Sequence, residues 1–249
     1  MHFTAETSSN GVVERDFTVG EVTGVLWSPA SAPEHTPLVL MGHGGGQDKK
    51  SPGVLARARP LVTTLGFSVA AIDLPGHGDR PPTAADYYHW SDLQQARAVG
   101  ESIGPVVVRY SAELAERAVP EWQMALDALQ ELPEIGTAHP VGYSGAMLST
   151  AIGVRLMAVD PRITAGVFRC FFSSESLLEA AGRVTAPIQL LLQWHDTDID
   201  RQDGLALFDA FASKEKTLHA NAGGHHQVPE FEADSTARFF ARHLGQAGT

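Results

Sequence analysis

Short apolar runs alternate with amphipathic segments along the chain from about residue 20 onwards. The apolar runs have the length and composition of strands, and most end at glycine, proline or a polar residue. We expect strands at residues 21–27, 37–41, 68–74, 141–143, 163–171, 188–194 and 216–220. Helical spacing predicts helices at residues 55–65, 122–132, 146–159, 205–211 and 231–244. This alternation predicts an α/β fold whose mostly parallel sheet is covered by helices on both faces.

Residues 79–120 interrupt this alternation. They contain a Pro81-Pro82 pair, an aromatic cluster at residues 87–90, and two helical stretches at residues 92–99 and 113–119. The segment is too long for a simple connection. We interpret it as a helical, cap-like insertion over the strand ends, within a single domain spanning residues 1–249; an irregular crossover is the alternative.

Composition excludes several classes of protein. The chain has 249 residues, a net charge of -11 and one cysteine, so it is long enough for a sizeable core and cannot form an internal disulfide. The acidic balance argues against binding to nucleic acid or to an anionic membrane. No apolar run has the length of a transmembrane helix, and the polar start has no signal-peptide pattern. We expect a cytoplasmic protein.

Ser144 stands between a predicted strand and a predicted helix, in His-Pro-Val-Gly-Tyr-Ser-Gly-Ala-Met. A serine becomes a nucleophile when a tight strand-to-helix turn exposes it, and such a turn needs small neighbours. Gly142 and Ala146 occupy those positions, although glycine is usual where Ala146 stands. A serine that only caps the next helix is the alternative interpretation.

Three consecutive glycines, residues 44–46, follow the strand at 37–41. Glycines let the backbone turn its amide hydrogens towards a developing negative charge. We expect the amides of Gly45 and Gly145 to form an oxyanion hole. A phosphate-binding loop is disfavoured because Gly-Lys-Ser/Thr is absent at the required spacing, whereas a plain flexible turn remains the alternative.

Acidic and histidine residues follow the last two predicted strands. Asp196 is our first choice for a carboxylate that orients a histidine, and Asp198 is the second; a solvated acidic turn is the alternative. The spacing does not fit a calcium loop, because Arg201 stands where glycine is required. A Gly-Gly pair precedes His225, which we prefer to His226 as the base. Adjacent histidines usually diverge, so we expect no metal and no cofactor.

Other polar and aromatic residues receive simpler interpretations. His43 and His77 are expected to brace loops or line a pocket, and Cys170 to be a buried apolar residue. A second group of residues is expected to form either an aromatic pocket wall or core packing: Tyr87, Tyr88, Trp90, Tyr110 and Trp194.

The order Ser144, Asp196, His225, each after a separate predicted strand, is that of the α/β-hydrolases. The chain resembles the dienelactone-hydrolase-like, esterase-type branch of this superfamily. Further similarity lies in Ile-Asp-Leu-Pro-Gly-His-Gly-Asp-Arg at residues 72–80, and in the segments at 191–196 and 214–221. The resemblance implies a serine nucleophile, an acid and a base at these three residues. Dienelactone hydrolases use cysteine, so serine favours a general ester or lactone.

We therefore expect a serine hydrolase that cleaves a carboxylic ester or lactone through an acyl-enzyme on Ser144, with a small-molecule ester as its substrate and with neither nucleic acid nor a membrane as a partner. An amidase, peptidase or carbon–carbon hydrolase with the same residues is one alternative. A non-catalytic, ligand-binding member of the fold is the other.

Overall fold

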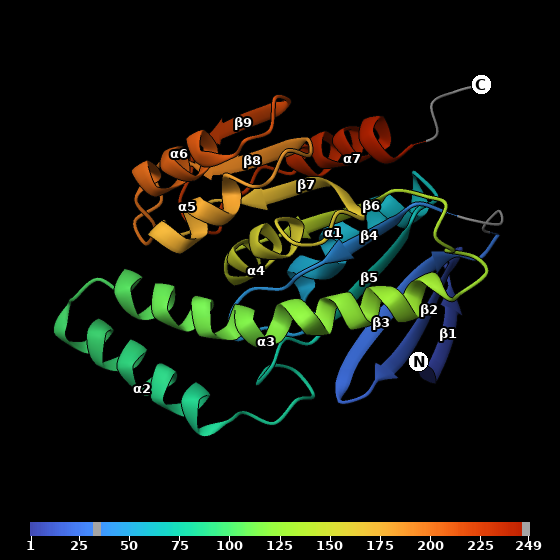
Figure 1. Cartoon of the computed structure of the whole chain (residues 1–249), viewed down its shortest axis with the longest axis horizontal. Helices are drawn as coiled ribbons and strands as arrows, with labels where there is room; N and C mark the ends of the chain where they lie inside the picture. Colours follow the sequence, from blue (N-terminus) through green and yellow to red (C-terminus); the bar gives the residue numbers. More distant parts are fainter. Residues whose placement is uncertain (32–35, 246–249) are drawn as a thin grey trace.

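The computed structural model describes residues 1–31 and 36–245. The strands are β1 (His2–Ser9), β2 (Val12–Val19), β3 (Val22–Pro29), β4 (Leu38–Met41), β5 (Ser68–Ile72), β6 (Val141–Gly145), β7 (Ile163–Arg169), β8 (Ile188–Gln193) and β9 (Lys216–Asn221). The helices are α1 (Pro52–Thr63), α2 (Ala84–Val99), α3 (Gly104–Gln130), α4 (Leu148–Met157), α5 (Glu175–Ala181), α6 (Arg201–Ala210) and α7 (Phe231–Leu244) (Figure 1).

These strands form one sheet in the order β1-β2-β3-β5-β4-β6-β7-β8-β9. The pairs from β1 to β5 are antiparallel, and every pair from β5–β4 to β8–β9 is parallel. The carboxyl ends of the parallel strands therefore meet at one edge, where ligands bind in sheets of this kind. The predicted α/β class and mostly parallel sheet are confirmed.

Alternating side chains along the strands divide the core into two layers. In β4, Leu38 and Leu40 belong to the layer that packs against α3, α4, α5 and α6, whereas Val39 and Met41 belong to the layer against α1 and α7. A strand buried on both faces reads as a continuous apolar run because both sets of positions are apolar. This is why β4 to β8 were visible in the sequence.

The hairpin of β1 and β2 was missed by the sequence analysis. Side chains of β1 are almost all exposed, so no apolar pattern marks the strand. The signal that was present is the Asn10-Gly11 pair, whose φ angles of 49° and 76° fit a two-residue hairpin turn.

Helices α2 and α3 form the segment interpreted as an insertion, and they lie as an arm along the bottom of Figure 1, with α2 outermost. The prediction of separate helices at residues 113–119 and 122–132 is wrong, because α3 is continuous across Pro120. A proline removes one backbone hydrogen bond. Packing of Leu114, Trp122 and Leu126 into the core holds the helix on both sides of it.

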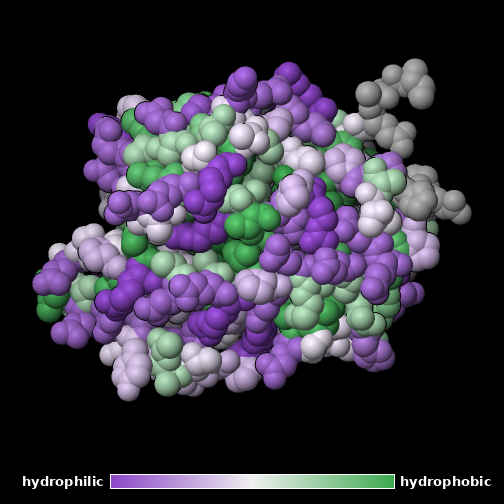
Figure 2. Space-filling view, in the orientation of Figure 1, coloured by the Kyte–Doolittle hydropathy of each residue, from purple (hydrophilic) through white to green (hydrophobic). Residues whose placement is uncertain are grey.

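The outer surface fits the acidic composition. The face in Figure 2 is mostly hydrophilic, with hydrophobic residues in small groups. Within residues 1–31 and 36–245, no helix is both long and apolar enough to span a bilayer.

Candidate active site

The turn between β6 and α4 has the strained geometry of a nucleophile elbow, and Met147 occupies it. Met147 has φ 58° and ψ -120°; only Ala146 separates it from the strand, and it directly precedes the helix. In the described chain, Asn10 in the hairpin turn is the only other non-glycine residue with a positive φ. Such a conformation is costly for a methionine and persists where the surrounding structure imposes it. In α/β-hydrolases this turn carries the nucleophile.

Close packing around the turn shows which residues make the motif. A Cβ on Gly145 would lie 2.6 Å from the backbone oxygen of Ser149 in α4, so strand and helix approach closely only with glycine there. A Cβ on Gly142 would instead meet Phe240 and Leu244 of α7, on the other side of the sheet. The elbow motif is therefore Gly145-Ala-Met-Leu-Ser149, three residues later than the predicted one.

The predicted position of Ser144 in the turn is wrong. Strand β6 runs to Gly145, two residues further than expected, so Ser144 lies inside it with 2% of its surface exposed. Its Oγ accepts a hydrogen bond of 2.9 Å from Nη1 of Arg57, a residue of α1. No hydrogen bond between Ser144 and His225 exists among the described residues.

His225 and Asp196 are brought together as predicted. Nδ1 of His225, after β9, lies 2.7 Å from Oδ2 of Asp196, after β8. The second oxygen of Asp196 accepts hydrogen bonds from the amides of Asp198 and Ile199, at 2.8 and 3.1 Å. When Nδ1–H of His225 donates this hydrogen bond to Asp196, Nε2 is the ring nitrogen that can accept a proton. The structure thus pairs His225 with Asp196 and leaves Asp198 exposed.

The glycine loop lies beside this pair. No acceptor in the described chain takes the amides of Gly45, Gly46 or Leu148, and all three residues line the same pocket as His225 and Met147. Leu148 directly follows the elbow and begins α4, where amides lack helical partners. Of the predicted oxyanion pair, Gly45 lines the pocket with His225, and its role stays a prediction. Gly145 lies in β6, and Leu148 stands at the position expected of it.

His43 fixes the loop to the next strand end, as expected. Its Nδ1 donates to the carbonyl of Gly44 at 2.8 Å, and its Nε2 accepts the amide of Leu74 at 3.1 Å. Burial lowers the pKa of His43 to about 4, against the opposing effect of the Gly44 bond. The imidazole is therefore neutral at pH 7 and serves as a brace.

The pocket over the elbow has a volume of about 360 Å³. Trp90 and His89 of α2 and Tyr110 of α3 line it, together with Phe171 and Phe172. Tyr87 and Tyr88 are 58% and 73% exposed and are not among its lining residues. Of the expected aromatic wall, Trp90 and Tyr110 are confirmed.

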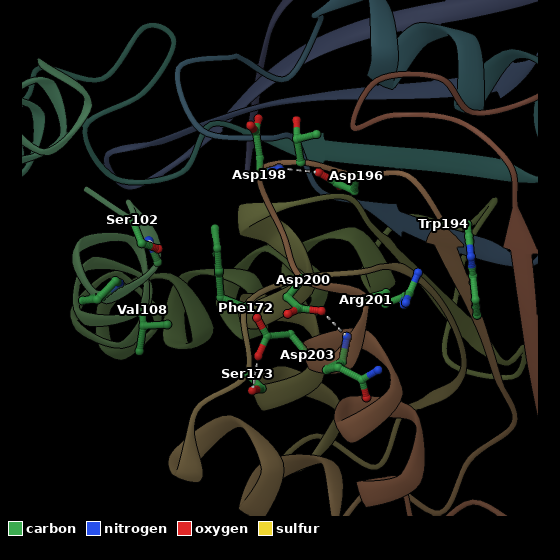
Figure 3. A pocket seen from close by; sticks show the side chains of 14 residues that line it. Ser102, Val108, Phe172, Ser173, Trp194, Asp196, Asp198, Asp200, Arg201 and Asp203 are labelled. Carbon is green, nitrogen blue, oxygen red and sulfur yellow. Dashed lines mark hydrogen bonds between the residues drawn. The ribbon is translucent and has the colours of Figure 1, made fainter. Parts of the chain in front are cut away.

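An acidic cavity of about 870 Å³ adjoins the site on the α6 side. Figure 3 shows Asp196 and Asp198 at one end of it and Asp200 and Asp203 further along, with Trp194 at the right of the view. Asp200 caps α6 through the amide of Gln202, and Asp203 accepts a hydrogen bond from Ser173, so these carboxylates have structural partners.

One group of described residues has the geometry to hold a metal ion. Asp196, Asp198 and His225 offer ligand atoms within 4.8 Å of one another. Carboxylate oxygens and an imidazole nitrogen suit zinc. His226, the other histidine considered in the sequence, does not belong to this group.

The sequence analysis missed three residues at the site. Met147 was marked by the Gly145-x-Met-x-Ser149 spacing, which keeps small residues on both sides of the turn. Arg57, on α1, and Arg169, at the end of β7, both approach the elbow region. A lone arginine in a helix or after a strand carries no distinguishing signal.

No protein-family model matches the chain, and neither does any curated protein. Among solved structures, a PEG-bound cold-adapted esterase from an Arctic intertidal metagenomic library is 31% identical, with 98% of this chain and 100% of that chain covered and a TM-score of 0.77. A zinc-bound structure of a cold-adapted esterase from such a library is 28% identical, with the same coverage and a TM-score of 0.71.

An acetyl xylan esterase from Paenibacillus sp. R4 is 13% identical, with 98% of this chain and 88% of that chain covered and a TM-score of 0.72, which supports the fold alone. The particular resemblance to dienelactone hydrolases stays a prediction. Full-length similarity above 30%, together with the sheet order, the elbow and the histidine–aspartate pair, shows that the chain belongs to the esterase-type α/β-hydrolases.

Proposed function

We propose that this protein hydrolyses a small-molecule ester with water as the direct nucleophile, activated by His225 and Asp196. The observation that carries the proposal is Met147 at the elbow beside an intact histidine–aspartate pair. The base and the unpartnered amides of a hydrolase site are present. A thioether has no proton to give up and forms no acyl-enzyme.

The reaction follows from these positions. Water attacks the ester carbonyl, and Nε2 of His225 takes its proton while Asp196 stabilises the imidazolium. The amides of Gly45, Gly46 and Leu148 bind the oxyanion. Collapse of the intermediate expels the alkoxide, which takes the proton from His225, so that one ester and one water give one acid and one alcohol.

The expected acyl-enzyme on Ser144 fits this site poorly. Its Oγ is held by Arg57 inside β6 and has no bond to the base among the described residues. Without a covalent nucleophile, an oxyanion hole and substrate binding still give about 10³–10⁴-fold acceleration over water in serine hydrolases. We therefore expect a slow esterase without a burst of product.

The test is turnover of an activated aryl ester, such as p-nitrophenyl acetate, together with mass spectrometry after a fluorophosphonate probe. We expect turnover above background with no adduct, and loss of that turnover in His225→Ala. His195→Ala is the matched control, since this histidine is exposed and does not line the ester pocket. An adduct on the Ser144 peptide, absent in Ser144→Ala, would overturn the mechanism in favour of the acyl-enzyme.

A ligand-binding protein without turnover is the second candidate, and Met147 at the elbow favours it directly. Esters that bind the folded wild type but are hydrolysed no faster than in buffer would establish it. Comparing matched ester and amide substrates separates an esterase from an amidase or peptidase.

A further inference from the structure

A second cavity, of about 570 Å³, lies on the other side of the elbow. Its wall comes from α1, from the ends of β6, β7 and β8, and from the start of α7. Met147 and His226 line both this cavity and the ester pocket, so the two adjoin at these residues. Small residues keep the space open: Gly53, Ala56, Ala146 and Ala233.

Two arginines face this cavity with no carboxylate partner. The guanidinium of Arg57 donates to neutral oxygens: Nη1 to Oγ and to the carbonyl of Ser144, at 2.9 and 3.3 Å, Nη2 to the carbonyl of Gly42 at 2.6 Å, and Nε to the carbonyl of Gly53 at 3.1 Å. Arg169 donates to the carbonyl of His225. Neither forms a salt bridge with a carboxylate of the described chain. By contrast, six other arginines do: Arg15, Arg80, Arg109, Arg117, Arg162 and Arg242.

The acidic residues at the cavity do not neutralise this pair. Glu232 is buried, and its two oxygens bind Nδ1 of His219 and Nδ2 of Asn221, at 2.9 and 2.8 Å. Glu230 is exposed and forms no ion pair with either arginine. No carboxylate of the described chain therefore forms an ion pair with either guanidinium, although the charge of Asp196 acts on Arg169 at longer range and opposes the lowering of its pKa.

Burial and the nearby Arg169 lower the pKa of Arg57 to about 10, and burial lowers the pKa of Arg169. Both guanidiniums stay charged at pH 7, at a cost that an anion between them would remove. Guanidinium forks bind planar carboxylates through two parallel hydrogen bonds. The apolar wall of Val167, Leu191 and Val228 suits an organic body attached to that carboxylate.

We propose that this cavity binds a small organic carboxylate, with Arg57 and Arg169 holding its anionic group. Neither arginine lines the ester pocket, so this proposal stands whether or not the chain hydrolyses esters.

The experiment is calorimetric titration with benzoate, and with benzamide as the neutral ligand of the same shape. We expect benzoate to bind and benzamide to bind at least about tenfold more weakly, because charge-assisted hydrogen bonds are roughly twice as strong as neutral ones. Equal affinity for the two, or no heat from benzoate, would overturn the proposal. Tighter binding of inorganic phosphate than of benzoate would overturn the carboxylate class.

Substitutions then locate the site. Ser144→Asp supplies a carboxylate next to Arg57, and we expect about a tenfold loss of benzoate affinity. The isosteric Ser144→Asn is its matched control and should keep most of the affinity. If Ser144→Asp fails to fold, Arg169→Gln carries the test, with exposed Arg59→Gln on α1 as control. Unchanged benzoate affinity in Arg169→Gln would place the ligand elsewhere.

Discussion

At the scale of single residues, Met147 has the backbone conformation of the elbow but not the nucleophilic side chain that usually accompanies it in this fold. The backbone of Met147 is strained, and His225 in the same pocket is hydrogen-bonded to Asp196. The thioether of Met147, however, has no proton that His225 could remove. The strain must therefore come from the packing of β6 against α4 through Gly145 and Ser149. The nucleophile is not needed to form the turn.

Restoring a hydroxyl at that position should create a covalent catalyst. We expect Met147→Ser to gain a fluorophosphonate adduct and a burst of product from an activated ester, because Oγ would be exposed beside His225. Mass spectrometry of the labelled protein and stopped-flow kinetics measure these two effects. Met147→Ala is the control and should show neither. Absence of any adduct in folded Met147→Ser would mean that His225 does not reach the elbow.

His43 should make the stability depend on acidity. Because burial lowers its pKa from 6.5 to about 4, the unfolded chain binds more protons than the folded one between these values. The contribution of His43 to the free energy of unfolding is therefore fully present above pH 6.5. It is lost as the pH drops towards 4, which lowers the free energy of unfolding by about 3 kcal/mol.

Urea denaturation across that range measures the effect. His43→Gln keeps polar side-chain atoms but has no group that titrates at this position. Its free energy of unfolding should therefore fall less steeply than that of the wild type below pH 6.5. The slope will not vanish, because burial also lowers the pKa of His77 and His89. Equal slopes for the two proteins would contradict the assignment.

At the scale of elements, the junction of β6 and α4 depends on close backbone approach. We expect Gly145→Ala to reduce the free energy of unfolding by about 1–3 kcal/mol, because the added Cβ lies 2.6 Å from a backbone oxygen that cannot rotate away. Gly53→Ala is the matched control. It lies in α1 with no atom within 4 Å of a new Cβ, and should gain about 0.5–1 kcal/mol. Chemical denaturation of the three proteins decides between these signs.

The elements also show what could be predicted from the sequence. Strands buried on both faces were found because consecutive apolar residues run along them, throughout β4 and at residues 190–192 of β8. Strand β6 was placed, but its end was set at Tyr143, since Ser144 and Gly145 look like turn residues. That error of two residues moved the elbow onto the serine. His225 and Asp196 were found because each follows a strand at the sheet edge.

Other features depend on contacts that leave no local pattern. The Arg57–Ser144 bond joins residues 87 apart in the chain, and neither residue type marks it. Helix α3 continues through Pro120 because the core holds both of its halves, an effect that proline alone argues against.

At the scale of the whole molecule, α2 is the least anchored helix. Asp86 and Ala96 are its buried residues, and α3 is the element it packs against. Asp86 links α2 to α3: its carboxylate accepts a hydrogen bond from the hydroxyl of Tyr110 at 2.9 Å and forms an ion pair with Arg117. The same carboxylate caps α2 by accepting the amide of Thr83 at 2.7 Å. Segments held by so few buried groups open locally without global unfolding.

Removing the Asp86 carboxylate should loosen α2, which lines the ester pocket, while the sheet stays folded. We expect Asp86→Ala to speed amide hydrogen exchange in residues 84–99, with little change in β4 to β8. Hydrogen-exchange mass spectrometry reads both regions in one measurement. Asp92→Ala, which removes an exposed ion pair with Arg109, is the control and should change little. Faster exchange throughout the sheet would show that α2 is part of the global folding unit.

The elbow has one more consequence, for how the value of a nucleophile is measured. In most serine hydrolases the contribution of the nucleophile to the rate is measured by replacing the serine. The base and the oxyanion hole that remain are then still adapted to the serine that was removed. Here the wild-type elbow already lacks a hydroxyl, and methionine adopts the strained backbone conformation of the turn. A single substitution would add the hydroxyl to a scaffold adapted to its absence, so the gain in rate would report what covalent attack contributes beyond positioning and charge.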